Sequence, residues 1–279
     1  MDNIITTEHI NAYCLSLLAD ERAAGTISKY RRDLTAFSLW LDGRAVTKES
    51  ATAWKACLLN RDYAPRTVNS MLAAVNGFCR FAGLPIKLKF LSIQRQIFRD
   101  SAKELSKAEY DRLLAAARES GQERLALIME TLCATGIRVS ELRYITVEAA
   151  LAGRATITLK GKIRTILLPA KLCRKLVKYA RKQKTASGEI FLTKSGRPIT
   201  RRQVWFELKR LCKAAGVEPT KVFPHNLRHL FATTFYRACR DIVRLADMLG
   251  HSSIDTTRIY LTVSGAEQQR QLDRLGLVS

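Results

Sequence analysis

The residues best suited to chemistry gather in one stretch of the sequence, from Phe223 to Leu261. An arginine, a tyrosine and three of the four histidines stand out there: His225, Arg228, His229, His251 and Tyr260. A guanidinium binds the non-bridging oxygens of a phosphate bidentately, imidazoles donate or accept protons, and a phenol can act as a nucleophile. This combination would suit the cleavage of a phosphodiester without a metal ion.

A helix is predicted to carry the first part of this stretch. Pro224 suits the first position of a helix that runs over 225–238. His225 and Arg228 are three residues apart, so they share one helical face. His229 directly follows Arg228, and we expect it to point off that face and to pack against the arginine's surroundings.

A second amphipathic helix, predicted over 241–249, leads to the next histidine. Gly250 is the expected residue just past its C-terminus, and His251 follows it. Tyr260 comes nine residues later, in the run TTRIY. The motifs HNLRH, LGHSS and TTRIY resemble those of the tyrosine recombinase family (phage-integrase and Xer type). The resemblance implies that four of these residues are catalytic: His225, Arg228, His251 and, as the nucleophile, Tyr260.

The segment TGIRVSEL, 135–142, is similar to the first arginine motif of the same family. The similarity places Arg138 on the scissile phosphate and makes Glu141 the acidic residue that orients it. From the residues alone, Arg138 could also be a surface arginine that caps a helix. Arg138 and Glu141 could likewise form an ordinary side-chain pair across one helical turn.

Residues 155–169 alternate between apolar and polar around a lysine-glycine-lysine turn, which predicts a β-hairpin. A lysine at such a tip could reach into a groove and protonate a leaving 5′-oxygen. The family resemblance places the catalytic lysine at Lys160. Lys162 stays open as the alternative, and otherwise as a DNA contact.

Four amphipathic helices are predicted in the N-terminal part, and the Gly-Leu-Pro sequence at 83–85 marks the end of the fourth. The resemblance assigns this part to a core-binding domain that clamps one side of the duplex, although its basic outer face could simply be solvated. The expected DNA contacts are Lys29, Arg31, Arg32, Arg66 and Thr67 here, with Arg201 and Arg202 in the C-terminal part.

The predicted fold is mainly α with a small β-sheet. It comprises a helical (SAM-like) core-binding domain over 1–85, a linker over 86–102, and an α+β catalytic domain over 103–279. The linker segment is basic and breaks the helical periodicity. Residues 266–277 suggest an amphipathic tail helix, which could pack on its own subunit or, as in relatives, on a neighbouring one.

Charge favours a polyanionic partner: 47 Lys and Arg against 25 Asp and Glu give a net charge of +22. No apolar run approaches the length of a membrane span, and the N-terminus has no signal-peptide pattern, so we expect a cytoplasmic protein without a membrane contact. Seven scattered cysteines indicate reduced thiols. Neither a metal site nor a cofactor motif is apparent, and none is expected.

The resemblance implies a site-specific DNA recombinase that cuts and rejoins DNA through a 3′-phosphotyrosyl intermediate on Tyr260. Its expected partner is a double-stranded recombination site, on which it forms a homotetramer through the C-terminal helix, with an accessory protein or a paralogous recombinase as a further open partner. A chain that starts at the core-binding domain favours an Xer-like or mobile-element integrase or excisionase. The alternatives are a type IB topoisomerase-like nicking enzyme and a catalytically silent DNA-binding module.

Overall fold

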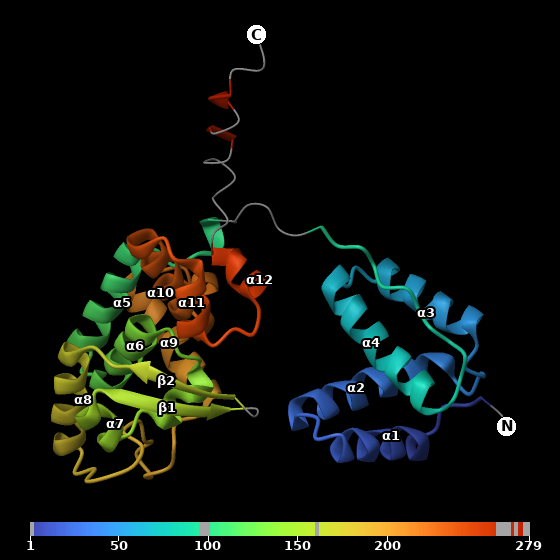
Figure 1. Cartoon of the computed structure of the whole chain (residues 1–279), viewed down its shortest axis with the longest axis horizontal. Coiled ribbons are helices and arrows are strands. Elements are labelled where there is room, and N and C mark those ends of the chain that lie inside the picture. The colour runs from blue at the N-terminus through green and yellow to red at the C-terminus, as the bar shows by residue number, and fades with distance from the viewer. Residues whose placement is uncertain (1–2, 95–100, 160–161, 261–268, 271–272, 276–279) are drawn as a thin grey trace. The chain divides into compact units, whose positions relative to one another are not determined.

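The computed structural model describes residues 3–94, 101–159, 162–260, 269–270 and 273–275. The chain divides into two compact units, Met1–Arg95 and Gln96–Ser279 (Figure 1). Each unit has its own hydrophobic core. The fold is mainly α with one small antiparallel sheet in the described residues, which confirms the predicted fold class. Within the described residues, no helix combines the length and apolar character needed to cross a bilayer.

The first unit consists of four helices: α1 (Thr7–Ala19), α2 (Ala24–Leu41), α3 (Lys48–Asn60) and α4 (Pro65–Phe81). Thr6 and Thr47 start α1 and α3 with side chains that accept hydrogen bonds from the first turn, and Pro65 occupies the first position of α4. Phe37 and Trp54 pack in the core with ring centroids 4.7 Å apart. These three helices therefore begin at residues that favour a helix start, whereas α2 begins at Ala24, ahead of the expected cap Thr26, and has no side-chain cap.

The chain that follows α4 stays attached to this unit. The side-chain oxygen of Asn76 accepts from the Leu88 backbone N–H at 2.7 Å, and its amide donates to the Leu88 carbonyl at 2.9 Å. Asn69 makes the same pair of bonds with Leu91, at 2.7 and 2.9 Å. The first part of the predicted linker, 86–102, is thus packed on the helical unit through two asparagines.

The second unit is built around α6 and α10, which pack against each other, with α5 and α9 forming a neighbouring pair (Figure 1). Its helices and strands are η1 (Ser101–Lys103), α5 (Lys107–Glu119), α6 (Glu123–Thr135), η2 (Val139–Tyr144), α7 (Val147–Ala152), β1 (Arg154–Leu159), β2 (Lys162–Leu167), α8 (Ala170–Lys182), α9 (Arg201–Ala215), η3 (Pro219–Lys221), α10 (Pro224–Cys239), α11 (Ile242–Leu249), α12 (Ile254–Thr257) and η4 (Arg258–Tyr260).

The predicted hairpin is present as β1 and β2, which pair antiparallel with Ile157 opposite Arg164. Inward and outward residues alternate along β2. Ile166 is 5% exposed, whereas Ile163 and Leu167 are 72% and 77% exposed. Arg164 falls on the same face as Ile166, so a charged side chain points toward the interior of the unit.

A third strand, which the apolar run 189–192 predicts, does not form. Only isolated bridges lie at its ends, from Glu189 to Thr146 and from Leu192 to Pro198. Thr146 is the N-cap of α7, and Thr200, two residues after Pro198, is the N-cap of α9. The chain therefore turns into a helix at or just after each bridge partner, and no ladder extends. The run between the bridges is nevertheless buried in the core.

Candidate active site

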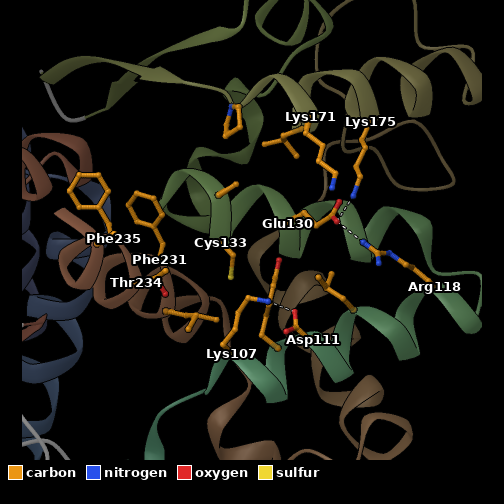
Figure 2. Close-up of a pocket in the computed structure, with 17 residues that line it drawn as sticks. Lys107, Asp111, Arg118, Glu130, Cys133, Lys171, Lys175, Phe231, Thr234 and Phe235 are labelled. Carbon is orange, nitrogen blue, oxygen red and sulfur yellow. Dashed lines mark hydrogen bonds and ion pairs between the residues drawn. The ribbon is translucent and has the colours of Figure 1, made fainter.

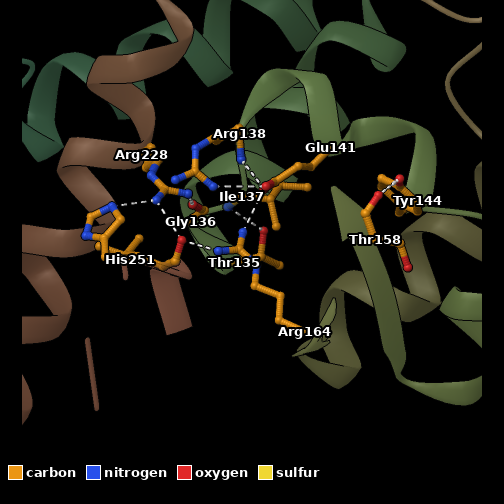
Figure 3. Close-up of polar contacts among 11 residues, drawn as sticks. Thr135, Gly136, Ile137, Arg138, Glu141, Tyr144, Thr158, Arg164, Arg228 and His251 are labelled. Atoms are coloured by element: carbon orange, nitrogen blue, oxygen red, sulfur yellow. Dashed lines mark hydrogen bonds and ion pairs between the residues drawn. The ribbon is translucent and has the colours of Figure 1, made fainter. Parts of the chain in front are cut away.

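The turn after α6 sets the position of Arg138. Gly136 ends α6 with φ at +65°, and a Cβ there would lie 2.3 Å from Cδ1 of Phe231. The backbone N–H and Nη1 of Arg138 donate to the carboxylate of Glu141 at 2.7 and 3.0 Å (Figure 3). The Glu141 side chain is 1% exposed and that of Arg138 is 42% exposed. A buried carboxylate therefore holds a guanidinium that remains accessible.

Arg228, on α10, is buried at 2% exposed. Its Nη1 donates to the Gly136 carbonyl at 2.6 Å, and its Nη2 donates to the Leu249 carbonyl at 2.8 Å. Burial and, after it, the charge of Arg138 lower the pKa of Arg228 to about 10, while Tyr260 opposes the shift. The guanidinium is still charged at neutral pH, in a desolvated place where its attraction for an anion is strong.

His251 follows Gly250, which ends α11 with φ at +64° as predicted. Its Nε2 lies 2.9 Å from Nη2 of Arg228, and its Nδ1 lies 2.8 Å from Oγ1 of Thr257. Burial and then the positive charge of Arg228 lower the pKa of His251 to about 4. The imidazole is therefore neutral at pH 7 and lies directly against the buried guanidinium.

Tyr260 closes this cluster from η4 and is 2% exposed. Its ring centroid lies 5.0 Å from that of His229 and 6.3 Å from that of His251, and its phenol interacts electrostatically with the Arg228 guanidinium. His229 also approaches Glu104, with 3.7 Å between Nε2 and Oε1. The predicted nucleophile thus lies beside the predicted phosphate ligand, and His229 packs on its ring.

His225 lines a pocket of about 610 Å³ together with Arg228. Burial and the positive charges of Arg228 and Arg138 lower the pKa of His225. The pocket brings together three predicted catalytic residues with two predicted DNA contacts: Arg138, His225 and Arg228 with Arg201 and Arg202. Four guanidinium groups around one opening favour an anionic ligand such as a phosphate.

Neither of the two candidates for the catalytic lysine has a described side chain. Lys160 is not among the described residues, and for Lys162 the structure gives only the backbone, which pairs with Leu159. The choice between the two lysines stays a prediction. The same holds for the tail helix over 266–277, which lies mostly outside the described residues.

The predicted DNA contacts of the first unit differ in what they already bind. Lys29 and Arg32 both pair with Asp33, which is 2% exposed, and Arg31 donates to an asparagine of α1. Lys29 therefore neutralises a buried carboxylate, whatever else it contacts. Two other predicted contacts are exposed at the start of α4: Arg66 and Thr67.

Two residues of the site were missing from the sequence-based predictions. Arg164 donates from Nη2 to Glu141 at 2.7 Å and from Nη1 to the Leu249 carbonyl, and Thr257 bonds the ring of His251. A signal for Arg164 was present in the sequence, because strand alternation places it on the inward face of the hairpin. No comparable signal marks Thr257, whose partner is set by the turn at the end of α11.

A second pocket, of about 660 Å³, lies between α5, α6, α8 and α10 (Figure 2). On its polar side, Oε1 of Glu130 accepts from Nη2 of Arg118 at 2.6 Å and from Nζ of Lys175 at 2.5 Å. None of the predicted catalytic residues lines it. In the part of the chain that the structure describes, no three His, Cys, Asp or Glu side chains group so as to hold a metal ion.

Comparison with known proteins identifies related sequences along nearly the whole chain. The model of the phage integrase family matches residues 103–267, and that of the phage integrase N-terminal SAM-like domain matches residues 10–83. Tyrosine recombinase XerC of Roseiflexus castenholzii is 32% identical over 279 residues, covering 91% of this chain and 88% of the relative. Tyrosine recombinase XerA of Pyrococcus furiosus is 27% identical over 285 residues, covering 99% and 97%.

The fold is also similar to that of solved structures. One of these is a lambda integrase tetramer bound to a Holliday junction, with a TM-score of 0.73 and 19% identity. The similarity covers 93% of this chain and 78% of the lambda integrase chain.

Proposed function

Because this chain belongs to the phage integrase family, we propose that it is a tyrosine-type site-specific recombinase of the Xer-like or mobile-element kind. One observation carries the proposal. Arg138, Arg228, His251 and Tyr260, which come from four separate segments of the chain, lie together in one site, and Glu141 orients the first of them. These are the groups needed to bind a phosphodiester and to attack it.

The proposed reaction exchanges one phosphodiester for another. Oη of Tyr260 attacks the phosphorus, the bond to O5′ breaks, and a 3′-phosphotyrosyl bond forms. The phenolic proton passes to a neutral imidazole, His225 or His251, and Lys160 protonates the leaving 5′-oxygen. A 5′-hydroxyl of the partner strand then attacks the phosphotyrosyl bond, and Tyr260 recovers its proton. The covalent bond conserves the phosphodiester energy, so strand joining needs no ATP.

The two arginines stabilise the charge that develops on the non-bridging oxygens. Arg138 meets the phosphate from the accessible side, and Arg228 meets it from the buried side. Tyr260 is 2% exposed in this structure, so η4 has to shift when the scissile phosphate enters. In that shift the phosphate replaces the phenol as the partner of Arg228.

For assembly we propose a homotetramer on a double-stranded recombination site, held partly by the tail helix over 266–277. Support comes from the charge of +22 and from similar integrases solved as dimers and tetramers on DNA. Strand exchange between two duplexes requires four cleavages, and hence four nucleophiles. A paralogous recombinase could occupy two of the four positions.

The test is a suicide-substrate assay with nicked duplexes made from DNA around the gene. Wild-type protein should form a covalent adduct on a denaturing gel, and Tyr260→Phe should form none. Tyr236→Phe is the matched control, since Tyr236 packs in the same apolar cluster as Tyr260. Tight binding without an adduct would favour a silent DNA-binding module, and relaxation of supercoiled DNA without strand exchange would favour a type IB topoisomerase-like enzyme.

A further inference from the structure

Arg164 joins two parts of the active site that are far apart in sequence. From the inward face of β2, its Nη2 donates to Oε2 of Glu141 at 2.7 Å. The same Oε2 accepts from the Arg138 backbone N–H at 2.7 Å, while Oε1 binds the Arg138 guanidinium. Arg164 and Arg138 thus share one buried carboxylate (Figure 3).

The other end of the Arg164 guanidinium binds the C-terminus of α11. Nη1 donates to the Leu249 carbonyl, the group that also accepts from Nη2 of Arg228 at 2.8 Å. The carbonyl end of a helix carries partial negative charge, which suits two cations. A single bridge, Glu141–Arg164–Leu249, therefore connects the guanidinium of Arg138 to that of Arg228.

Gly250 shows how closely this bridge is packed. A Cβ at Gly250 would lie 1.9 Å from Nη1 of Arg164 and 2.8 Å from its Cδ and Cζ. The residue after this glycine is His251, whose ring bonds Arg228. The position of Arg164 therefore also limits where the backbone before His251 can run.

Stability alone does not account for an arginine here. The Arg164 side chain is 15% exposed, and its Nε is buried with no hydrogen-bond partner among the described residues. Burial and the nearby charge of Arg138 act against its ionised form. A buried ion pair is often matched or exceeded in stability by apolar side chains of similar volume. An arginine with one unsatisfied N–H and two other guanidinium groups nearby fits a role in the reaction better.

We propose that Arg164 is a positioning residue, which fixes the spacing between the Arg138 guanidinium and the Arg228–His251 pair. The proposal rests on the proposed function, because the spacing matters for a phosphate held between the two arginines. Without Arg164, Glu141 loses a partner, the Arg138 side chain can pivot, and the end of α11 loses one of its two cations. The two arginines are then no longer preorganised for the transition state.

The test measures single-turnover cleavage at saturating DNA with Arg164→Met, Arg164→Lys and the control Arg154→Met. Arg154 is an exposed arginine of the same hairpin. Each protein is given two suicide substrates, one with a normal scissile phosphodiester and one with a methylphosphonate at that position. The methylphosphonate lacks the negative charge that the arginines stabilise, so their spacing should matter less for it.

Arg164→Met should cleave the phosphodiester about 10- to 100-fold more slowly than wild type, with unchanged DNA affinity. On the methylphosphonate the difference from wild type should shrink toward none. The cleavage rate of Arg164→Lys on the phosphodiester should lie between those of wild type and Arg164→Met, since one ammonium group cannot bridge both acceptors. Arg154→Met should match wild type on both substrates.

Three results would overturn the positioning role: an equal loss on both substrates, a wild-type rate for Arg164→Met, or full activity of Arg164→Lys. If Arg164→Met shows no cooperative unfolding transition, it is not properly folded. In that case Arg164→Lys is compared with wild type on the two substrates instead. The proposed function fails separately, when wild type itself forms no adduct on the phosphodiester.

Discussion

Nη2 of Arg228 lies 2.9 Å from Nε2 of His251, and this contact fixes the protonation of the histidine. A guanidinium can only donate, so Nε2 must be the acceptor and the proton must sit on Nδ1. Oγ1 of Thr257, 2.8 Å from Nδ1, then accepts that proton's hydrogen bond. The ring cannot donate from Nε2 to a phosphate until Arg228 turns away from it. Binding of the scissile phosphate should therefore change the tautomer or the charge of His251.

The stability of the folded protein should depend on pH through His251. Its pKa is about 4 in the folded state against an ordinary value of 6.5, because of burial and the charge of Arg228. Between these values the unfolded chain binds more protons than the folded one, so stability falls as the pH drops from 6.5 to 4. The lowered pKa of His225 acts in the same direction. Urea unfolding across this range should show a smaller loss for His251→Gln than for wild type; parallel curves would contradict the assignment.

Glu141→Gln should weaken both the fold and the reaction. The buried carboxylate balances Arg138 and Arg164, and an amide leaves part of their charge unpaired, at about 1–3 kcal/mol of unfolding free energy. Glu130→Gln is the matched control, because Glu130 also pairs with two cations but lies outside the site. The control should lose about 1 kcal/mol or less and keep its cleavage rate. Equal effects of the two substitutions on cleavage would argue against a role for Glu141 in orienting Arg138.

Gly250→Ala should be more harmful than Gly153→Ala, although both glycines end helices with similar φ, +64° and +69°. The backbone strain of about 1–2 kcal/mol is common to both substitutions. A Cβ at Gly153 meets nothing within 4 Å, whereas one at Gly250 meets the Arg164 guanidinium. Thermal unfolding should show the larger loss for Gly250→Ala, and only this variant should cleave DNA more slowly. Equal losses would mean that Arg164 moves aside at no cost.

The identity of the catalytic lysine can be tested with a 5′-bridging phosphorothiolate. A thiolate is a good leaving group without a proton, so a variant that lacks the general acid should regain activity on this substrate. Lys160→Met should cleave the normal substrate slowly and the phosphorothiolate at nearly the wild-type rate. Lys162→Met should show no such rescue. Rescue of Lys162→Met instead would assign the proton to Lys162.

Much of the fold followed from local sequence signals. Ser106 with Glu109 and Thr200 with Gln203 match the capping-box pattern, in which a Ser or Thr is followed three residues later by Glu or Gln, and they start α5 and α9. Gly250 ends α11 in the expected left-handed conformation. These features depend on neighbours within one or two turns, which is why a single sequence shows them.

The parts that could not be predicted depend on contacts between distant segments. Arg164 meets the Leu249 carbonyl across 85 positions, so no local spacing reveals that contact. The burial of Tyr260 likewise results from packing against α10 and α11. The apolar run over 189–192 looked like a strand because burial and β-pairing favour the same residue types. Whether it forms a strand depends on the segments that it pairs with, and these form only isolated bridges. The charged residue on the inward face of β2 was the one visible sign of the bridge between the arginines.

Whether Tyr260 forms a 3′-phosphotyrosyl bond can be determined on the covalent adduct itself. The adduct formed by wild-type protein on a suicide substrate is digested with protease, and mass spectrometry identifies the peptide that carries nucleotide. A parallel reaction with the cleaved strand labelled at its 5′ or 3′ end shows which side of the break stays on the protein. We expect nucleotide on Tyr260 and retention of the 5′-labelled fragment. Nucleotide on any other residue, or retention of the 3′-labelled fragment, would rule out a 3′-phosphotyrosyl bond on Tyr260.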